Sequence, residues 1–224
     1  PGVPETTYVN DIVTSQHDAN TVYVAFNNHK RGDFKPYILK SVDKGKSWTA
    51  IQGNLPARGS VYAIAEDHVN PNLLFVGTEF GLYFSLDGGN DWTKLGAGLP
   101  TIAIRDIEIQ KRENDLVLAS FGRGFYILDD YTPLRTYRKG IADKGAHIFP
   151  VKDALMFVDS RPLGGRGKGS QGASYYTAEN PPIGATFTYM IKDTLRTIKE
   201  ERQKKEKKLV KAGQKVPYPS FAMM

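Results

Sequence analysis

The chain of 224 residues is long enough for one sizeable domain, and its lack of cysteine excludes disulfides and thiolate metal sites. Its 12 Tyr and 11 Phe favour β-strands, while its 22 Gly and 13 Pro indicate many turns. Residues 192–215 hold 10 of the 30 basic and 4 of the 24 acidic residues, so they account for the net charge of +6, and the neutral remainder argues against a nucleic-acid-binding protein.

Two segments near the N-terminus recur further along the chain. Residues 9–25 align with 61–77 at an offset of 52, and "SVDKGKSWTAI" (41–51) returns as "SLDGGNDWTKL" (85–95) at an offset of 44. The eight extra positions fit an insertion around "HKRGDFKP" in the first copy.

A third copy follows at an offset of 43. Residues 104–120 align with 61–77, and residues 124–130 align with 81–87. This copy lacks the tryptophan of the recurring box, and degeneracy is expected in a terminal unit.

Each copy predicts four short strands separated by turn signals. In the second copy, these strands are 61–66, 73–77, 81–85 and 92–95. A period in the forties with four strands per repeat predicts β-propeller blades, so the fold class is all-β with about three blades. By their position in each blade, strands 9–13, 61–66 and 104–109 should be innermost and face the central channel.

The recurring box S-x-D-x-G-x-x-W is explained by turn chemistry. Its serine and aspartate can bond backbone amides of the hairpin between the third and fourth strands, its glycine permits a positive φ, and its tryptophan is expected to be buried in the blade core. The predicted structural residues are Ser41, Asp43, Gly45, Trp48, Ser85, Asp87, Gly89 and Trp92.

These boxes resemble the Asp-boxes, or BNR repeats, of sialidases and the sortilin family. The runs "FVGTEFGLYFSLDGGNDW", "LASFGRGFYILDDYTPLR" and "ENPPIGATFTY" are most similar to a group of large bacterial secreted proteins with a sortilin-like propeller, often labelled glycosyl hydrolases. The resemblance implies a secreted, periplasmic or cell-surface bacterial protein.

Three blades cannot close a ring around a channel. We therefore expect the remaining blades on the same or another polypeptide. The chain begins at Pro1 and ends within a predicted domain, and we expect it to be part of a larger protein. No run is long and apolar enough for a membrane span, and no signal-peptide pattern is present.

The expected domains are the blades at 1–158, a Gly/Pro-rich linker at 159–182 and the start of a second β domain at 183–224. Within the first, "YTPLR" and 145–158 are predicted to supply the last outer strands and a segment along the propeller. The linker does not match a phosphate-binding loop, because Lys168 is followed by Gly169 rather than by serine or threonine. The resemblance implies a β-sandwich for the second domain, opening with a strand at 183–191.

A charged helix is predicted at about 193–212, with Gly213 as its stop signal. Between Ile198 and Leu209 it has no apolar residue, so it cannot bury a continuous stripe. A solvated arm with i,i+4 ion pairs is one interpretation, and a contact for an acidic partner or a membrane surface is the other.

No catalytic constellation is evident. A glycosidase needs two facing carboxylates, but Asp129 and Asp130, as neighbours in a strand, would point to opposite faces. Four further acids lie on or beside innermost strands and could line a channel without a reaction: Glu66, Asp67, Asp106 and Glu108.

Metal or cofactor binding is not predicted either. The four histidines lack the spacing of metal ligands, and the turn positions of two of them favour structural roles. These histidines are His17, His29, His68 and His147.

Arg123 is the candidate ligand-binding residue. In "FGRGF", Gly122 and Gly124 permit close backbone approach, and the guanidinium could meet a carboxylate on a peptide or sugar. The alternative is a tight turn in which Arg123 pairs with a neighbouring acid. Three functions remain open: a non-catalytic propeller that binds a polypeptide or glycan, a glycoside hydrolase of BNR-repeat type, and a structural subunit of a cell-surface complex.

Overall fold

A computed structural model describes residues 2–96, 98–154, 156, 158, 183–192 and 195–217. The chain divides into two compact units, Pro1–Arg138 and Lys139–Met224, and the domain boundary expected at 158 stays a prediction. The predicted linker at 159–182 falls outside the described residues.

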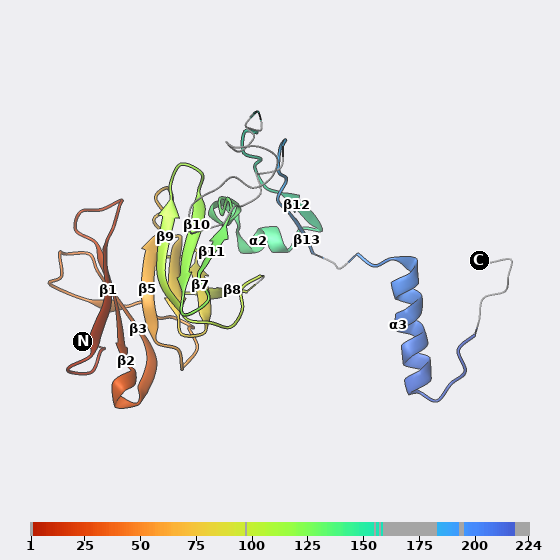
Figure 1. Ribbon diagram of the computed structural model, residues 1–224, viewed down its shortest axis with the longest axis horizontal. Helices are drawn as coiled ribbons and strands as arrows, with labels where there is room; N and C mark the ends of the chain where they lie inside the picture. Colours follow the sequence, from red (N-terminus) through yellow and green to blue (C-terminus); the bar gives the residue numbers. More distant parts are fainter. Residues whose placement is uncertain are drawn as a thin grey trace, which may run out of the picture. The chain divides into compact units, whose positions relative to one another are not determined.

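The first unit contains three antiparallel sheets, which follow one another in chain order (Figure 1). The first has the order β1 (Tyr8–Thr14), β2 (Val22–Asn28), β3 (Asp33–Ser41) and β4 (Thr49–Ala50). The second has the order β5 (Val61–Glu66), β6 (Leu74–Thr78), β7 (Gly81–Ser85) and β8 (Trp92–Leu95). The third consists of β9 (Ile104–Gln110), β10 (Asp115–Ser120) and β11 (Phe125–Leu128). The predicted strands are confirmed within one residue in the second copy, and the architecture is that of a partial β-propeller.

The eight-residue insertion of the first copy forms a 3-10 turn, η1 (His29–Arg31), and the start of β3. Gly32 follows in the left-handed conformation with φ 77°, and its amide donates to the carbonyl of His29. The insertion therefore lengthens one hairpin and leaves the four-strand order unchanged.

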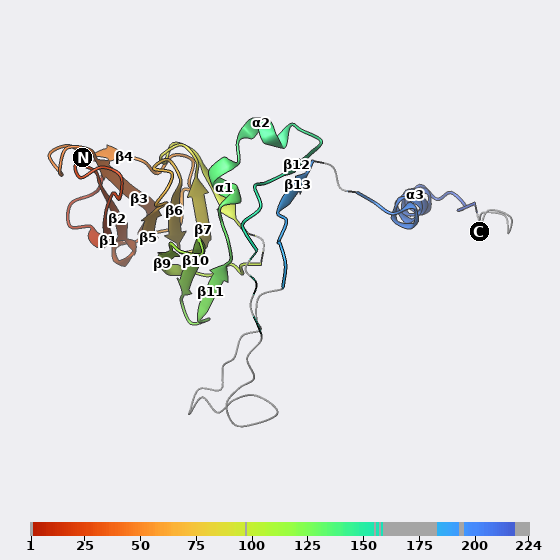
Figure 2. The same cartoon turned by 90° about the horizontal axis from the view of Figure 1, so that it is seen from above.

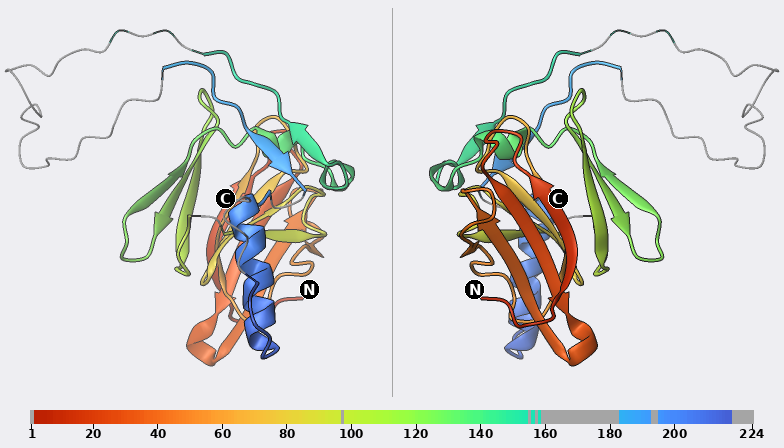
Figure 3. Two further views of the ribbon diagram at one scale, coloured as in Figure 1. Left: turned by 90° about the vertical axis from the view of Figure 1, so that its right-hand side faces the viewer. Right: turned by 90° about the vertical axis from the view of Figure 1, so that its left-hand side faces the viewer.

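The sheets pack face to face, with β1 and β2 against β5, and β5 and β6 against β9 (Figure 2). Every residue of β5, β6 and β7 is buried, because the second sheet is covered on both faces. Among the described residues, the first and third sheets each pack against one neighbouring sheet, and the third fans out from the other two (Figure 3).

Gly77 marks the closest approach of the second and third sheets. A Cβ atom at this position would lie 2.7 Å from the carbonyl oxygen of Ile104 and 3.0 Å from its Cγ2. We expect Gly77→Ala to destabilise the protein by about 1–3 kcal/mol, measured by urea unfolding, because the sheets would have to separate. Gly96→Ala is the control, since a Cβ there meets nothing within 4 Å. Equal stabilities of the two variants would contradict the prediction.

The prediction that "YTPLR" begins the last outer strands is wrong. Residues Pro133–Thr136 form a short helix, α1, with Thr132 as its N-cap and proline at the first helical turn. The third sheet accordingly has three strands among the described residues.

The second unit contains α2 (Lys139–Ala142), a two-stranded sheet of β12 (Ala146–Ile148) and β13 (Tyr189–Ile191), and α3 (Ile198–Lys211). The charged helix is therefore confirmed, but it begins later than 193 because Thr197 and Glu200 form a capping box. None of its residues is buried. No described helix is both long and apolar enough to cross a membrane.

Candidate functional site

The two box hairpins hold themselves together through the same hydrogen bonds. In the first, the Gly45 amide donates to Ser41 Oγ at 2.8 Å, and the Ser47 amide donates to Asp43 Oδ1 at 2.8 Å. In the second, the Gly89 amide donates to Ser85 Oγ at 2.9 Å, and the Asp91 amide donates to Asp87 Oδ1 at 2.9 Å. The carboxylates are therefore occupied by their own turns.

The pKa values of the two box aspartates reflect these bonds. Hydrogen bonds from the Ser47 side chain and amide lower the pKa of Asp43 to about 2. Burial opposes ionisation of Asp87, but amide and hydroxyl donors outweigh it and lower its pKa. Both carboxylates are thus ionised at neutral pH and act as hydrogen-bond acceptors.

The two box tryptophans differ in burial. Trp92 is 4% exposed, and its Nε1 donates to the carbonyls of Ile51 at 2.9 Å and Gly89 at 3.1 Å. Trp48 is half-buried, so the prediction that both tryptophans lie in a blade core is wrong for this one. The segment after the first sheet covers Trp92, whereas the described residues include no equivalent segment over Trp48.

Glu66 joins the first sheet to the second. It is 2% exposed and accepts hydrogen bonds from Ser15 Oγ, the Gln16 amide and Tyr23 Oη at 2.7–3.0 Å. Burial and the adjacent carboxylate raise the pKa of Tyr23, which keeps the phenol protonated as a donor. Glu66 is therefore an acceptor between two sheets and does not line a channel.

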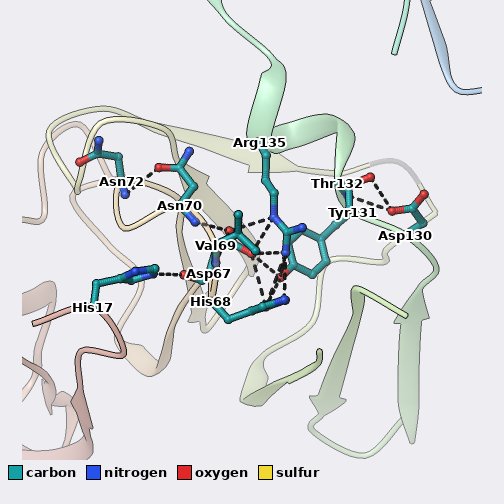
Figure 4. A network of polar contacts seen from close by, with 10 residues as sticks. All are labelled: His17, Asp67, His68, Val69, Asn70, Asn72, Asp130, Tyr131, Thr132 and Arg135. Atoms are coloured by element: carbon teal, nitrogen blue, oxygen red, sulfur yellow. Dashed lines mark hydrogen bonds and ion pairs between the residues drawn. The ribbon is translucent and has the colours of Figure 1, made fainter. Parts of the chain in front are cut away.

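Asp67 is the centre of a second buried network (Figure 4). Its carboxylate accepts hydrogen bonds from Arg135 Nη2 at 2.7 Å, Arg135 Nε at 2.9 Å and Tyr131 Oη at 2.5 Å. It also accepts from the amides of Asn70 and Val69 at 2.7 and 3.1 Å. Burial opposes its ionisation, but the bonds from Arg135 and Tyr131 outweigh this and lower its pKa.

Two histidines border this network. His17 Nε2 lies 2.7 Å from the carbonyl oxygen of Asp67, so the turn after β1 contacts the turn after β5. Burial and the nearby Arg135 lower the pKa of His68, which is therefore neutral at pH 7. The network links residues of the first two repeats to the segment that follows the third, and its carboxylate is fully bonded, which suits a structural clamp better than a general base.

Sequence reasoning missed Tyr131 and Arg135 as partners of Asp67. The signal was present, because proline after Thr132 indicates a helix start and the i,i+4 spacing places both side chains on one side of the turn. Asp130 lies beyond the end of β11, and its Oδ1 accepts from the amide and the hydroxyl of Thr132. Asp129 is exposed beside it, and neither residue is in the strand that was expected to hold both.

A shared bulge in the first strand of each sheet positions three equivalent side chains. The register shifts between Val9 and Asp11 in β1, between Val61 and Ala63 in β5, and between Ile104 and Asp106 in β9. The extra residues are Asn10, Tyr62 and Arg105. A bulge re-aims its side chain, so the repeat presents these three residues in the same way.

Arg105 lies between two aromatic rings. Its guanidinium carbon is 3.8 Å from the centre of the Tyr62 ring and 5.1 Å from that of Phe121. Arg105 is exposed and Phe121 is 68% exposed, so the cation remains accessible while the rings orient it.

Arg123 is exposed and lies two residues after Phe121. It stands between Gly122 and Gly124, whose φ angles are 77° and 72°. The hairpin is closed by the Ser120 amide and hydroxyl, which both donate to the Gly124 carbonyl. Within the described residues, no hydrogen bond or ion pair joins Arg123 to an acid. Tyr62, Arg105, Phe121 and Arg123 are called the arginine patch below.

Asp106 and Glu108, the other two acids that were expected near the inner strands, are exposed. Asp106 and Glu108 are two residues apart in β9, and so they share one face of the third sheet. Asp106 Oδ1 accepts the amide of Ile107 at 2.9 Å. The described residues contain no cluster of three His, Asp or Glu side chains arranged for a metal ion.

No protein-family model matches the chain, and no curated protein matches it. Several solved structures resemble it in part, including the following three. The GH74 enzyme of Niastella koreensis is 22% identical with a TM-score of 0.45, over 55% of this chain and 21% of that one. The GH74 xyloglucanase of Xanthomonas campestris is 16% identical with a TM-score of 0.45, over 64% and 25%. The extracellular domain of BT4673 from B. thetaiotaomicron is 16% identical with a TM-score of 0.44, over 58% and 16%.

The chain thus spans a quarter or less of the length of each of these proteins. Because none of the TM-scores reaches 0.5, the assignment of blades rests on the sheets themselves.

Proposed function

We propose that this chain is a non-catalytic, ligand-binding part of a sortilin-like Asp-box propeller. The parent protein would be a larger bacterial protein that is secreted, periplasmic or on the cell surface. The proposal draws on the box hairpins, whose serine and aspartate side chains serve their own turns. It also draws on Glu66 and Asp67, whose buried carboxylates are occupied by hydrogen bonds and are not free for acid–base chemistry.

The observation that carries the proposal is the arginine patch. Arg105 is exposed and oriented by two rings, and Arg123 is exposed at the tip of the adjoining hairpin. A guanidinium presents a planar fork of donors that matches a carboxylate, and an exposed ring next to it offers an apolar contact. The ligand class is therefore a polypeptide or glycan that carries a carboxylate.

Calorimetry with acidic peptides and uronate oligosaccharides tests this function. We expect Arg123→Ala and Arg105→Ala each to weaken binding by on the order of tenfold, because each removes a charge-assisted hydrogen bond. Arg112→Ala is the matched control, since Arg112 is an exposed arginine of the turn between β9 and β10 that pairs with Glu113 at 3.0 Å. If neither ligand class binds, or if all three variants bind equally well, the proposal is wrong.

A glycoside hydrolase is the second candidate, and the exposed pair Asp106 and Glu108 favours it. Reducing-sugar release from a polysaccharide panel would have to disappear in both Asp106→Asn and Glu108→Gln. Release that survives either change would remove this pair as the acid and base.

A further inference from the structure

The outer face of the third sheet carries large apolar side chains that meet solvent. Val117 pairs with Glu108 on one side and with Ile127 on the other, while Ala119 pairs with Asp106 and Phe125. Paired residues share a face, so these six residues form one surface, called the trailing face. Phe125 is 75% exposed and Ile127 is 61% exposed.

The second sheet shows what covers such a face. The two sheets can be aligned by the bulge in the first strand of each. In this alignment Phe75, Leu82 and Phe84 of the second sheet correspond to Val117, Phe125 and Ile127 of the third. These three residues are no more than 6% exposed, because they pack against the next sheet. Large apolar residues occupy the same positions in both sheets, but among the described residues only the second sheet is followed by another blade.

Asp106 is a polar residue of the trailing face whose equivalent in the first sheet bonds the next sheet. It follows the bulge of β9 as Asp11 follows the bulge of β1, and each is paired with an alanine of the neighbouring strand. Asp11 Oδ2 accepts the backbone amide of Ile64 in the first strand of the next sheet at 3.0 Å. Asp106 has no next sheet among the described residues and accepts the amide of its own neighbour, Ile107.

We propose that the trailing face binds a further four-stranded blade of this repeat, and that Asp106 accepts a backbone amide of its first strand. The matching surface of that blade is known from this chain. Val61, Ile64, Val76 and Tyr83 of the second sheet form it and are buried against the first sheet. The proposal does not depend on the arginine patch, so it can fail or succeed apart from the proposed ligand.

The first sheet carries the same surface, called the leading face, and therefore supplies a probe. Val9, Ile12, Val24 and Leu39 occupy the equivalent positions by register. Val9 and Ile12 are 53% and 63% exposed, whereas Val24 and Leu39 are only 5% and 6% exposed, so the open part of this face lies on β1. A leading face of one copy should thus pack on the trailing face of another. Such head-to-tail contacts lead to rings or filaments, so each end must be blocked separately in order to isolate one contact.

Two variants, each with one face blocked by a charge, isolate a single head-to-tail contact. Ile12→Asp blocks the leading face and Ile127→Asp the trailing face, and both changes are at exposed positions that should not disturb folding. We expect each variant alone to sediment as a monomer and the equimolar mixture to form a heterodimer. A mixture that stays monomeric at the highest soluble concentration overturns the proposal, as does self-association of either variant.

Asp106 is tested within the same mixture. Adding Asp106→Ala to the Ile12→Asp variant should weaken the heterodimer by on the order of tenfold, because the hydrogen bond to the amide is lost. Glu108→Ala is the matched control on the same face, and it should leave the dimer equal or tighter, since the equivalent residue Ala65 packs in the established interface. Equal weakening by both changes would overturn the assigned role of Asp106.

Discussion

Replacing Trp92 by alanine should destabilise the protein by about 3–5 kcal/mol, the range found for large buried aromatic residues. The ring is 4% exposed, and its Nε1 bonds the carbonyl of Ile51, so the change leaves a cavity and removes a link between the first and second sheets. Urea unfolding followed by circular dichroism measures the loss.

Trp48 is the matched comparison, because it occupies the same position of the other box. Its ring is half-buried, and we expect Trp48→Ala to cost only about 1 kcal/mol. Trp92→Phe should lie between the two, since it keeps most of the ring and loses the Nε1 donor. Equal costs at positions 48 and 92 would show that covering by the neighbouring sheet does not decide the contribution of this residue.

Arg135→Met should destabilise the protein by about 3–5 kcal/mol at pH 7, because it leaves the fully buried carboxylate of Asp67 without its cation. The bidentate contact at 2.7–2.9 Å and the hydroxyl of Tyr131 stabilise the ionised form, and only part of this remains after the change. Arg112→Ala should cost less than about 1 kcal/mol, since its ion pair with Glu113 is exposed.

The ion pair of Asp67 and Arg135 predicts that the protein loses stability as the pH falls. The pKa of Asp67 is lowered in the folded protein, so its stabilising contribution is complete above the unfolded pKa near 4 and disappears as the pH falls through the lower folded value. Urea unfolding from pH 6 down to about pH 2 should therefore show a smaller acid loss in Asp67→Asn than in the wild type. An identical loss in both proteins would exclude Asp67 as a source of acid sensitivity.

The fold could be predicted from local features that repeat along the chain. Strand 61–66 and strand 92–95 agree with the structure at both ends, because short runs of strand-forming residues end at turns marked by glycine and asparagine. The box residues followed from turn chemistry, which acts over four or five positions and does not require knowledge of distant contacts.

The candidate site could be predicted only in part. The role of Arg123 in ligand binding stays a prediction, although the two glycines that flank it have the positive φ values that were expected of a tight turn. Arg105 could not be recognised from the sequence, because its orientation comes from a bulge and from aromatic rings of two other segments.

The sequence by itself determined the repeat, its strands and its self-bonded hairpins, since these depend on side chains that act within one turn or one strand. Only the tertiary structure decided which residues are buried and paired. Asp67 and Arg135 are 68 positions apart, and Trp92 is buried while Trp48 is only half-buried, because stacking one sheet on the next removes more water from one copy than from the other.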